Sequence, residues 1–161
     1  MDDFERRHLL YAQYCTELNG FRTHGEQPMN MFEMYNHCEE YFKASECTWH
    51  DIHMDDQIIG FIVMGNRVPY VHPECDYAIC EAYIIPEYRR RGLMTQVVRS
   101  LVEEYPGKYC LLVLDGNEYA KKFWNKAFAS MRYEPCDLDD SCVNGNGDCV
   151  CNFGFKPGGG S

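Results

Sequence analysis

The stretch of this sequence that most plainly suggests chemistry is three arginines followed by a glycine, at residues 89–92. It follows an apolar segment, residues 77–85, and opens an amphipathic segment, residues 92–105. A strand, a short basic turn and a helix in that order make an anion site, because the first turn of a helix has N–H groups without internal partners and a dipole that favours negative charge. We therefore expect a phosphate-bearing ligand at the amides of residues 91–95.

The charge balance limits the partners that this chain can bind. Across 161 residues, 25 acidic and 15 basic side chains give a net charge of −10. This charge argues against a nucleic-acid binder, because phosphate contacts need a basic surface. The same negative field attracts cations, so a second substrate that carries an amine is compatible with it. An arginine cluster on this acidic background therefore indicates a local site.

One domain is the expected organisation, because 161 residues with 45% hydrophobic side chains are enough for one core. We expect this domain to cover residues 1–157, followed by a flexible Gly/Ser tail at residues 158–161. The first residues carry no apolar signal segment, and the longest apolar run, residues 58–64, is too short to span a bilayer. A cytoplasmic protein without a membrane partner is the expectation.

Hydrophobic periodicity predicts a mixed order of helices and strands. Helical spacing predicts helices over residues 4–18, 31–42, 92–105 and 120–131, and short apolar runs predict strands over residues 49–54, 57–64, 77–85, 109–114, 132–137 and 149–155. Asn30 with Glu33 should cap the second helix, and Asp115 with Glu118 the last. Segment 77–85 is apolar on both faces except at Glu81, so it should be a central strand.

Apolar stripes on the first two helices are expected to face the core. The first helix carries on one face Phe4, Tyr11, Cys15 and Leu18. The second helix carries Met31, Met34, Tyr35, Cys38 and Phe42. Methionine and aromatic stripes at this spacing usually pack in a core, and a role in lining a substrate site is the alternative.

Ten cysteines are many for a chain of this length. No Cys-x-x-Cys pair occurs, so free thiols in a reducing compartment are the first interpretation. Four late cysteines could instead supply zinc ligands or form disulfides: Cys136, Cys142, Cys149 and Cys151. Neither this spacing nor that of the histidines has the pattern of a metal site, so no metal is expected.

Two short motifs occur on the expected elements. Arg-x-x-Gly-x-Met at residues 89–94 follows the central strand and the lead-in Ile-Ile-Pro-Glu-Tyr, and Asn-x-x-Ala-x-x-Phe-Trp at residues 117–124 follows the next strand, with Lys126 and Phe128 after it. Together they resemble the GNAT superfamily of acyl-CoA-dependent N-acetyltransferases, whose usual patterns are Arg/Gln-x-x-Gly-x-Gly/Ala and Asn-x-x-Ala-x-x-Phe-Tyr. The resemblance covers residues 58–155 and is fairly specific, because each motif lies on the right element.

The resemblance implies an α/β (α+β) fold, with a mixed, mostly antiparallel central sheet that is splayed at its middle strands and flanked by helices. It also implies acetyl-CoA as co-substrate, with its diphosphate on the turn at 89–95 and its pantetheine arm along the backbone of residues 83–85. A backbone N–H there would serve as oxyanion donor. The residues implied for acetyl-CoA binding are Ile84, Ile85, Arg89, Arg90, Arg91, Gly92, Leu93, Met94, Thr95, Asn117, Ala120, Phe123, Trp124 and Lys126.

Acetyl transfer to an amine also needs a base, because an alkylamine with a pKa of about 10.4 is almost wholly cationic at neutral pH. Glu81 is the best candidate, since an apolar setting raises the pKa of a carboxylate toward the value that suits a base. The alternatives are a Glu81 that points to solvent beyond the sheet or that pairs with an arginine.

Two residues depart from the family pattern. Met94 takes the place of a small residue, and Trp124 takes the place of the tyrosine that protonates the leaving thiolate in many members. An indole cannot donate a proton at neutral pH, so the acid is open among Tyr83, Tyr119 and Tyr133. A thiolate whose thiol has a pKa of about 8.5 can also leave without a protein acid.

The sequence thus predicts an acetyl-CoA-dependent N-acetyltransferase that acts on a primary amine of a small molecule or on an exposed amino group. A non-catalytic acyl-CoA-binding module is the alternative, favoured by Met94 and Trp124, and a metal or redox module built on the late cysteines is a third. Polyamines, aminoglycosides, amino acids and protein N-termini all remain open as acceptors, and a homodimer through the last strands is compatible with the pattern.

Overall fold

The structure is a computed structural model that describes residues 1–22, 27–138 and 150–158. Its helices are α1 (Asp3–Asn19), α2 (Met31–Lys43), α3 (Leu93–Glu104) and α4 (Glu118–Ser130), with a 3₁₀ turn at Pro86–Tyr88. Its strands are β1 (Cys47–Met54), β2 (Gln57–Gly65), β3 (Tyr77–Ile84), β4 (Tyr109–Leu114), β5 (Tyr133–Cys136) and β6 (Val150–Pro157). In these ranges the strands form one sheet of order β1-β2-β3-β4-β6-β5, with β3–β4 as its parallel pair.

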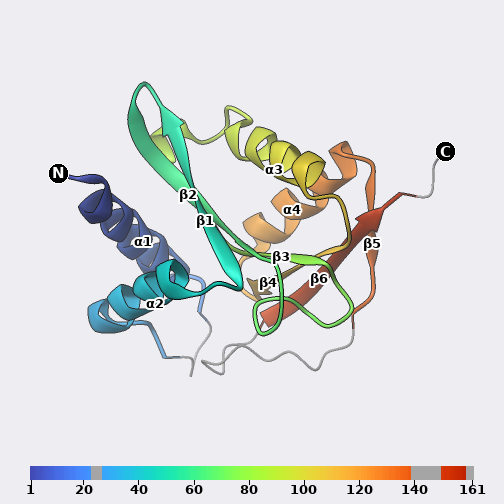
Figure 1. The fold of residues 1–161 in the computed structure, drawn as a ribbon, viewed down its shortest axis with the longest axis horizontal. Coiled ribbons are helices and arrows are strands. Elements are labelled where there is room, and N and C mark those ends of the chain that lie inside the picture. The colour runs from blue at the N-terminus through green and yellow to red at the C-terminus, as the bar shows by residue number, and fades with distance from the viewer. Residues whose placement is uncertain (23–26, 139–149, 159–161) are drawn as a thin grey trace.

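Helices cover both faces of this sheet. Figure 1 shows α1 and α2 on one side and α3 and α4 on the other. The core is divided accordingly: Leu10, Met34 and Phe61 belong to the cluster under α1 and α2, and Val98 and Phe128 to the cluster under α3 and α4. The predicted α/β class, with a mostly antiparallel sheet flanked by helices, is confirmed.

Both N-terminal helices begin with reciprocal caps. The Asn30 side chain accepts from the Glu33 amide at 2.9 Å while the Glu33 carboxylate accepts from the Asn30 amide, as predicted. Asp2 and Glu5 make the same capping box on α1. Each box satisfies N–H groups that the first turn of a helix leaves without partners.

The predicted core stripe on α2 is wrong in part. Met34 and Cys38 are buried, but Met31, Tyr35 and Phe42 are exposed. Met34 and Cys38, four residues apart, lie on the side of α2 that meets the sheet and α1. Met31 and Tyr35 lie on a neighbouring row, and Phe42, near the end of the helix, packs on Trp49 with ring centroids 4.8 Å apart.

The neighbouring row on α2 contacts a histidine of α1 through Tyr35. The His8 ring stacks on Tyr35 with centroids 4.5 Å apart, and it also contacts Phe4 at 4.5 Å. Phe4, predicted to face the core, is half exposed. These aromatic rings therefore join α1 to α2 at the surface and do not fill the interior.

Strand β3 is central, as predicted, and carries a bulge that decides where Glu81 points. Met64 pairs with Ile79 and Val63 pairs with Glu81, so Cys80 is an additional residue on β3. In a regular strand Ile79 and Glu81 would lie on the same face. Because of the bulge, Ile79 packs under α3 and α4, whereas Glu81 lies among α1 and α2.

The sheet opens beside β3. Within the described residues, β3 and β4 are paired at Tyr77↔Tyr109 and Ala78↔Cys110 and not beyond. Among the described residues, the remaining length of β3 therefore has no strand on that side, which is the splay expected between the middle strands.

The ends of the fold depart slightly from expectation. The tail is expected to start at residue 158, but the Gly158 amide donates to the Arg132 carbonyl at 2.8 Å. Residues 159–161 and the predicted loop at 139–148 lie outside the described residues. None of the described helices is both long and apolar enough to cross a membrane.

Candidate functional site

A cavity of about 460 Å³ occupies the gap between β3, the start of α3, α1 and α4. In the described part of the chain, its lining includes every residue expected to bind acetyl-CoA except Ile85 and Arg91. Those that line it are Ile84, Arg89, Arg90, Gly92, Leu93, Met94, Thr95, Asn117, Ala120, Phe123, Trp124 and Lys126. Residues from two distant motifs thus meet around one space.

The start of α3 has backbone amides of the kind that the predicted anion site requires. Gly92 has φ +73°, a left-handed conformation that lets the turn run directly into the helix, and a Cβ there would meet nothing within 4 Å. The first α-helical bond runs from the Gln96 amide to the Gly92 carbonyl at 3.1 Å. The amides of residues 93–95 precede that bond, so they have no partner in the helical ladder. They are the N–H groups on which an anion would be expected.

Strand β3 offers backbone groups to the same cavity. The Ile85 amide donates to the Ile59 carbonyl at 2.9 Å, and Tyr83 pairs with Phe61. Because backbone groups alternate along an antiparallel strand, those of Ala82 and Ile84 point to the opened side. Both residues line the cavity. The structure thus places Ala82 and Ile84 there, whereas the expected stretch was residues 83–85.

The first two of the three arginines have different surroundings. Arg89 is partly buried; it donates to both carboxylate oxygens of Glu17 and, through Nε, to the Ile84 carbonyl at 2.8 Å. Its guanidinium also lies over the Tyr83 ring, 5.3 Å from the centroid. Arg90 is exposed and lines the cavity. Arg89 therefore supports the wall, and Arg90 is better placed to meet a phosphate.

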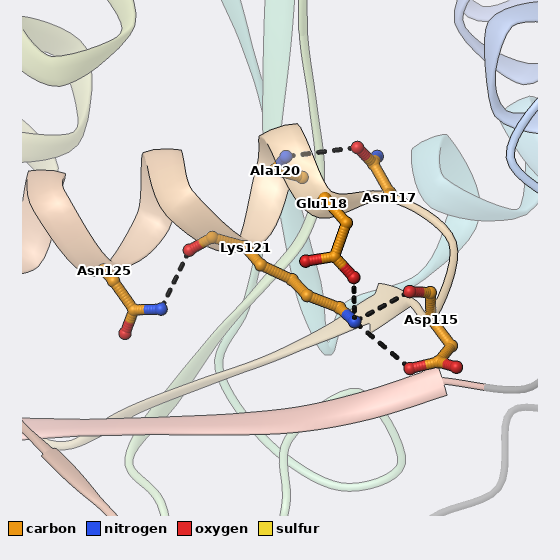
Figure 2. A network of polar contacts seen from close by, with 6 residues as sticks. All are labelled: Asp115, Asn117, Glu118, Ala120, Lys121 and Asn125. Atoms are coloured by element: carbon orange, nitrogen blue, oxygen red, sulfur yellow. Dashed lines mark hydrogen bonds and ion pairs between the residues drawn. The ribbon is translucent and has the colours of Figure 1, made fainter.

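The start of α4 is capped by a different residue from the expected pair. The Asn117 side chain accepts from the Ala120 amide at 3.1 Å (Figure 2). Asp115 and Glu118, predicted to form the cap, both bind the Lys121 ammonium at 3.1 Å. The prediction is wrong because Asn117 lies directly before the first helical residue, where an N-cap acts.

Glu81 lies beside the cavity within a group of tyrosines. Tyr11 of α1 donates a hydrogen bond to its carboxylate, with an Oη to Oε2 distance of 3.4 Å, and the hydroxyls of Tyr14 and Tyr41 are near enough to favour its charged form. Burial raises the pKa of Glu81 to about 7, and the three tyrosine hydroxyls limit the rise because they favour the charged form. Glu81 itself is not among the described residues that line the cavity.

The candidate acids are spread over the fold. Tyr83 and the exposed Tyr119 line the cavity. Tyr133, on β5, packs against Phe128 and Tyr109 and is absent from the cavity lining in the described ranges. Trp124 is a buried part of the wall.

Tyr14 is a cavity residue that sequence reasoning missed. It lines the cavity, and its hydroxyl is near enough to Glu81 to lower the pKa of that carboxyl. The available signal was its position three residues after Tyr11, since that spacing puts both side chains on one helix face.

The cysteines give no sign of a metal centre in the described residues. Cys136 is a free thiol, as are the described cysteines of the core. No group of His, Cys, Asp and Glu in those ranges is suited to hold a metal ion. Cys142, Cys149 and the side chain of Cys151 lie outside what the structure describes.

Known structures share this architecture. An acetyltransferase from Thermus thermophilus matches with a TM-score of 0.61 and 12% identity over 91% of this chain and 86% of that one. The ribosomal-protein-alanine N-acetyltransferase from Brucella melitensis gives 0.60 and 13% over 96% and 94%. The microcin C7 self-immunity acetyltransferase MccE, solved with acetyl-CoA and AMP, gives 0.59 and 12% over 94% and 84%. At these identities the likeness shows the fold.

The family of the protein is identified from its sequence. A comparison with curated protein sequences finds no match. The model of the acetyltransferase (GNAT) family, in contrast, matches residues 10–129, which includes both motifs and the strand that carries Glu81. Since this match covers most of the chain, the protein belongs to the GNAT family of acetyltransferases.

Proposed function

We propose that this protein transfers the acetyl group of acetyl-CoA to a primary amine, either of a small molecule or of an exposed amino group. The observation that carries the proposal is the end of β3–β4 pairing after Ala78, which opens the free edge of β3 and the start of α3 into one cavity. Residues far apart in the sequence thereby offer N–H donors to both ends of a long, anionic thioester.

The residues present fit acetyl-CoA. The amides of residues 93–95 and the exposed Arg90 suit its diphosphate. The opened side of β3 at Ala82 and Ile84 suits the amides of its pantetheine arm, in the manner of an added strand. Phe123 and the buried Trp124 supply an apolar part of the cavity wall.

The reaction needs an amine freed of its proton. Glu81, with its pKa raised to about 7 by burial, is a proton acceptor that is available in both forms at neutral pH. The amine nitrogen then attacks the thioester carbonyl carbon; a C–N bond forms and the C–S bond breaks. An N–H of β3 at the opened edge would support the charge on the carbonyl oxygen. The thiolate leaves with the electron pair and takes up the second proton of the amine, which yields free CoA thiol and an acetamide.

A panel of amines tests this function. Acetyl-CoA should raise the melting temperature of the protein, and free thiol should be released when the right amine is added. The panel contains a polyamine, an aminoglycoside, an amino acid and a peptide with a free N-terminus. Thiol release without an amine serves as the control for simple hydrolysis.

A non-catalytic acyl-CoA-binding module is the second candidate, because Trp124 lines the cavity where many relatives are expected to carry a tyrosine. The same panel separates the two. A rise in melting temperature with no thiol release for any amine would support the binding module and reject the transferase. No rise in melting temperature would reject both.

A further inference from the structure

We propose that the acceptor is a small primary amine whose remainder is apolar and carries no second positive charge. The inference rests on the proposed function and deepens it, because it names the class of amine. It starts from the side of the cavity that the two motifs leave unused. This side is formed by α1 and the residues just after it, through Tyr14, Glu17, Leu18 and Phe21.

The proposed base places the acceptor on this α1 side. Figure 1 shows α1 on the face of the sheet opposite α3 and α4, whose residues are expected to bind acetyl-CoA. Glu81 lies on the α1 face, where Tyr11 donates to its carboxylate at 3.4 Å. Tyr83, two residues further along β3, packs in the same cluster as Tyr11 and lines the cavity. An amine that gives its proton to Glu81 therefore has its carbon skeleton beside Tyr83 and the residues of α1.

The end of α1 is held on both sides of the opening between β3 and β4. On the β3 side, the Glu17 carboxylate accepts two hydrogen bonds from Arg89, at 2.9 and 2.7 Å. On the β4 side, the Phe21 carbonyl lies so close to Gly116, in the turn before α4, that a Cβ on Gly116 would collide with it. Leu18 lines the cavity between these two contacts. The wall is therefore fixed at both ends, and its side chains can select among amines.

The charges of this wall are already paired within the protein. Among the described residues that line the cavity, Glu17 supplies the one carboxylate, and Arg89 donates to both of its oxygens. The same guanidinium lies over the Tyr83 ring, 5.3 Å from the centroid, and so covers an aromatic face that could hold a cation. The other charged residues in this described lining are basic: Arg89, Arg90 and Lys126.

A second ammonium group on the acceptor would therefore be unfavourable. It would find no carboxylate at this wall that is not already paired, and it would meet the positive charge of Arg89. Its loss of hydration would not be offset by a partner. Polyamines and aminoglycosides, which carry several ammonium groups, do not suit the site for this reason.

The rest of the wall is apolar. Leu18 and Phe21 line the cavity, and the ring of Tyr14 lies against that of Tyr83, with centroids 5.8 Å apart. Such a surface gains free energy when an alkyl or aryl group covers it. The net charge of −10 attracts cations to the protein as a whole, but selection at the wall depends on these contacts. An amine on an apolar chain or ring is thus the acceptor that the wall suits.

Two matched substrates test the inference on the unmodified protein. Hexylamine and hexamethylenediamine share one carbon chain, but the diamine carries a second ammonium group at the far end. We measure kcat/KM for thiol release with each amine, at saturating acetyl-CoA and constant ionic strength. Hexylamine should be used at least about tenfold more efficiently, although the diamine offers two reactive groups. Phenethylamine should behave like hexylamine, because its ring is also apolar.

A charge placed on the wall should change this preference. Phe21→Asp adds a carboxylate there, so the ratio of the two kcat/KM values should move at least about tenfold toward the diamine. Phe32→Asp is the matched control, since Phe32 is exposed on α2 and absent from the described cavity lining. It adds the same charge and should leave the ratio within about twofold. If Phe21→Asp does not fold, Leu18→Asp takes its place.

The outcomes separate this inference from the proposed function. Use of the diamine, a polyamine, an aminoglycoside, an amino acid or a peptide as efficiently as hexylamine would reject the inference and leave the transferase in place. An equal change of the ratio by Phe21→Asp and Phe32→Asp would also reject it, because the wall would then have no local effect. If no amine releases thiol, the proposed function is rejected and the inference with it.

Discussion

Arg89 and Glu17 join the arginine-rich turn to helix α1 through two parallel hydrogen bonds, at 2.9 and 2.7 Å, across 72 positions of sequence. The side chains are 30% and 38% exposed, respectively, so solvent screens the pair. Arg89 also donates to the Ile84 carbonyl and lies over the Tyr83 ring. The first arginine of the turn is thus committed to the protein, and the wall that it supports belongs to the cavity.

Substitution of Glu17 and substitution of Arg89 should therefore lower the free energy of unfolding by different amounts. Glu17→Gln should lower the free energy of unfolding by less than about 1 kcal/mol, as for exposed ion pairs. Arg89→Ala also removes the bond to Ile84 and the contact with Tyr83, so we expect a loss of about 2 kcal/mol. Urea denaturation measures both. Equal losses would mean that the ion pair, and not the contacts to β3, makes up the contribution of Arg89.

Arg90 should carry more of the affinity for acetyl-CoA than an arginine elsewhere on the same turn and helix. It lines the cavity, whereas Arg99, exposed on α3, does not among the described residues. Arg90→Ala should raise the Kd for acetyl-CoA about tenfold, equivalent to about 1.4 kcal/mol. Arg99→Ala removes the same charge and should leave the Kd within about twofold. Calorimetric titration gives both constants, and equal weakening by the two variants would indicate only a long-range field.

Glu81 makes a distinctive contribution to stability as pH changes. Burial raises its folded pKa to about 7, above the ordinary 4.5, so the folded state binds this proton more tightly than the unfolded chain. The stabilisation is complete below pH 4.5 and is lost as the pH rises to about 7. Across that window the free energy of unfolding of wild type should fall relative to that of Glu81→Gln by up to about 1.4 kcal/mol per pH unit.

Denaturant titrations of both proteins at several pH values measure this difference. Because the two chains share every other titrating group, their difference isolates Glu81. A difference that stays constant between pH 4.5 and 7 would show that Glu81 has an ordinary pKa in the folded state.

Asn117 should matter for stability through its cap on α4. Asn117→Ala leaves the Ala120 amide without its acceptor and should cost about 1 kcal/mol. Asn125 lies on the same helix and donates to the Lys121 carbonyl from an exposed position (Figure 2). Asn125→Ala should change the free energy of unfolding by less than about 0.5 kcal/mol. Thermal melts of both variants check the contrast, and matching losses would argue against the cap.

Local patterns in the sequence were sufficient for the elements, and the resemblance of two motifs to a known family supplied much of the cavity lining. The strand at Tyr109–Leu114 has the predicted bounds, and the cap of Asn30 by Glu33 forms as expected. Such features depend on residues within a few positions of one another, where periodicity and capping chemistry act. The motif that begins at Arg89 also determines, by itself, a helix start with open amides.

Long-range packing decided the rest. The sequence contains no sign that Arg89 would bind Glu17, or that a bulge at Cys80 would turn Glu81 toward α1 and α2. Likewise Tyr14 becomes a cavity residue only because α1 lies against the opened edge of β3. Side-chain partners across about 60 or 70 positions depend on how helices pack on the sheet, and composition and spacing along one segment do not contain that information. The sequence therefore determined the elements and the two motifs, and the tertiary structure decided which residues face the cavity.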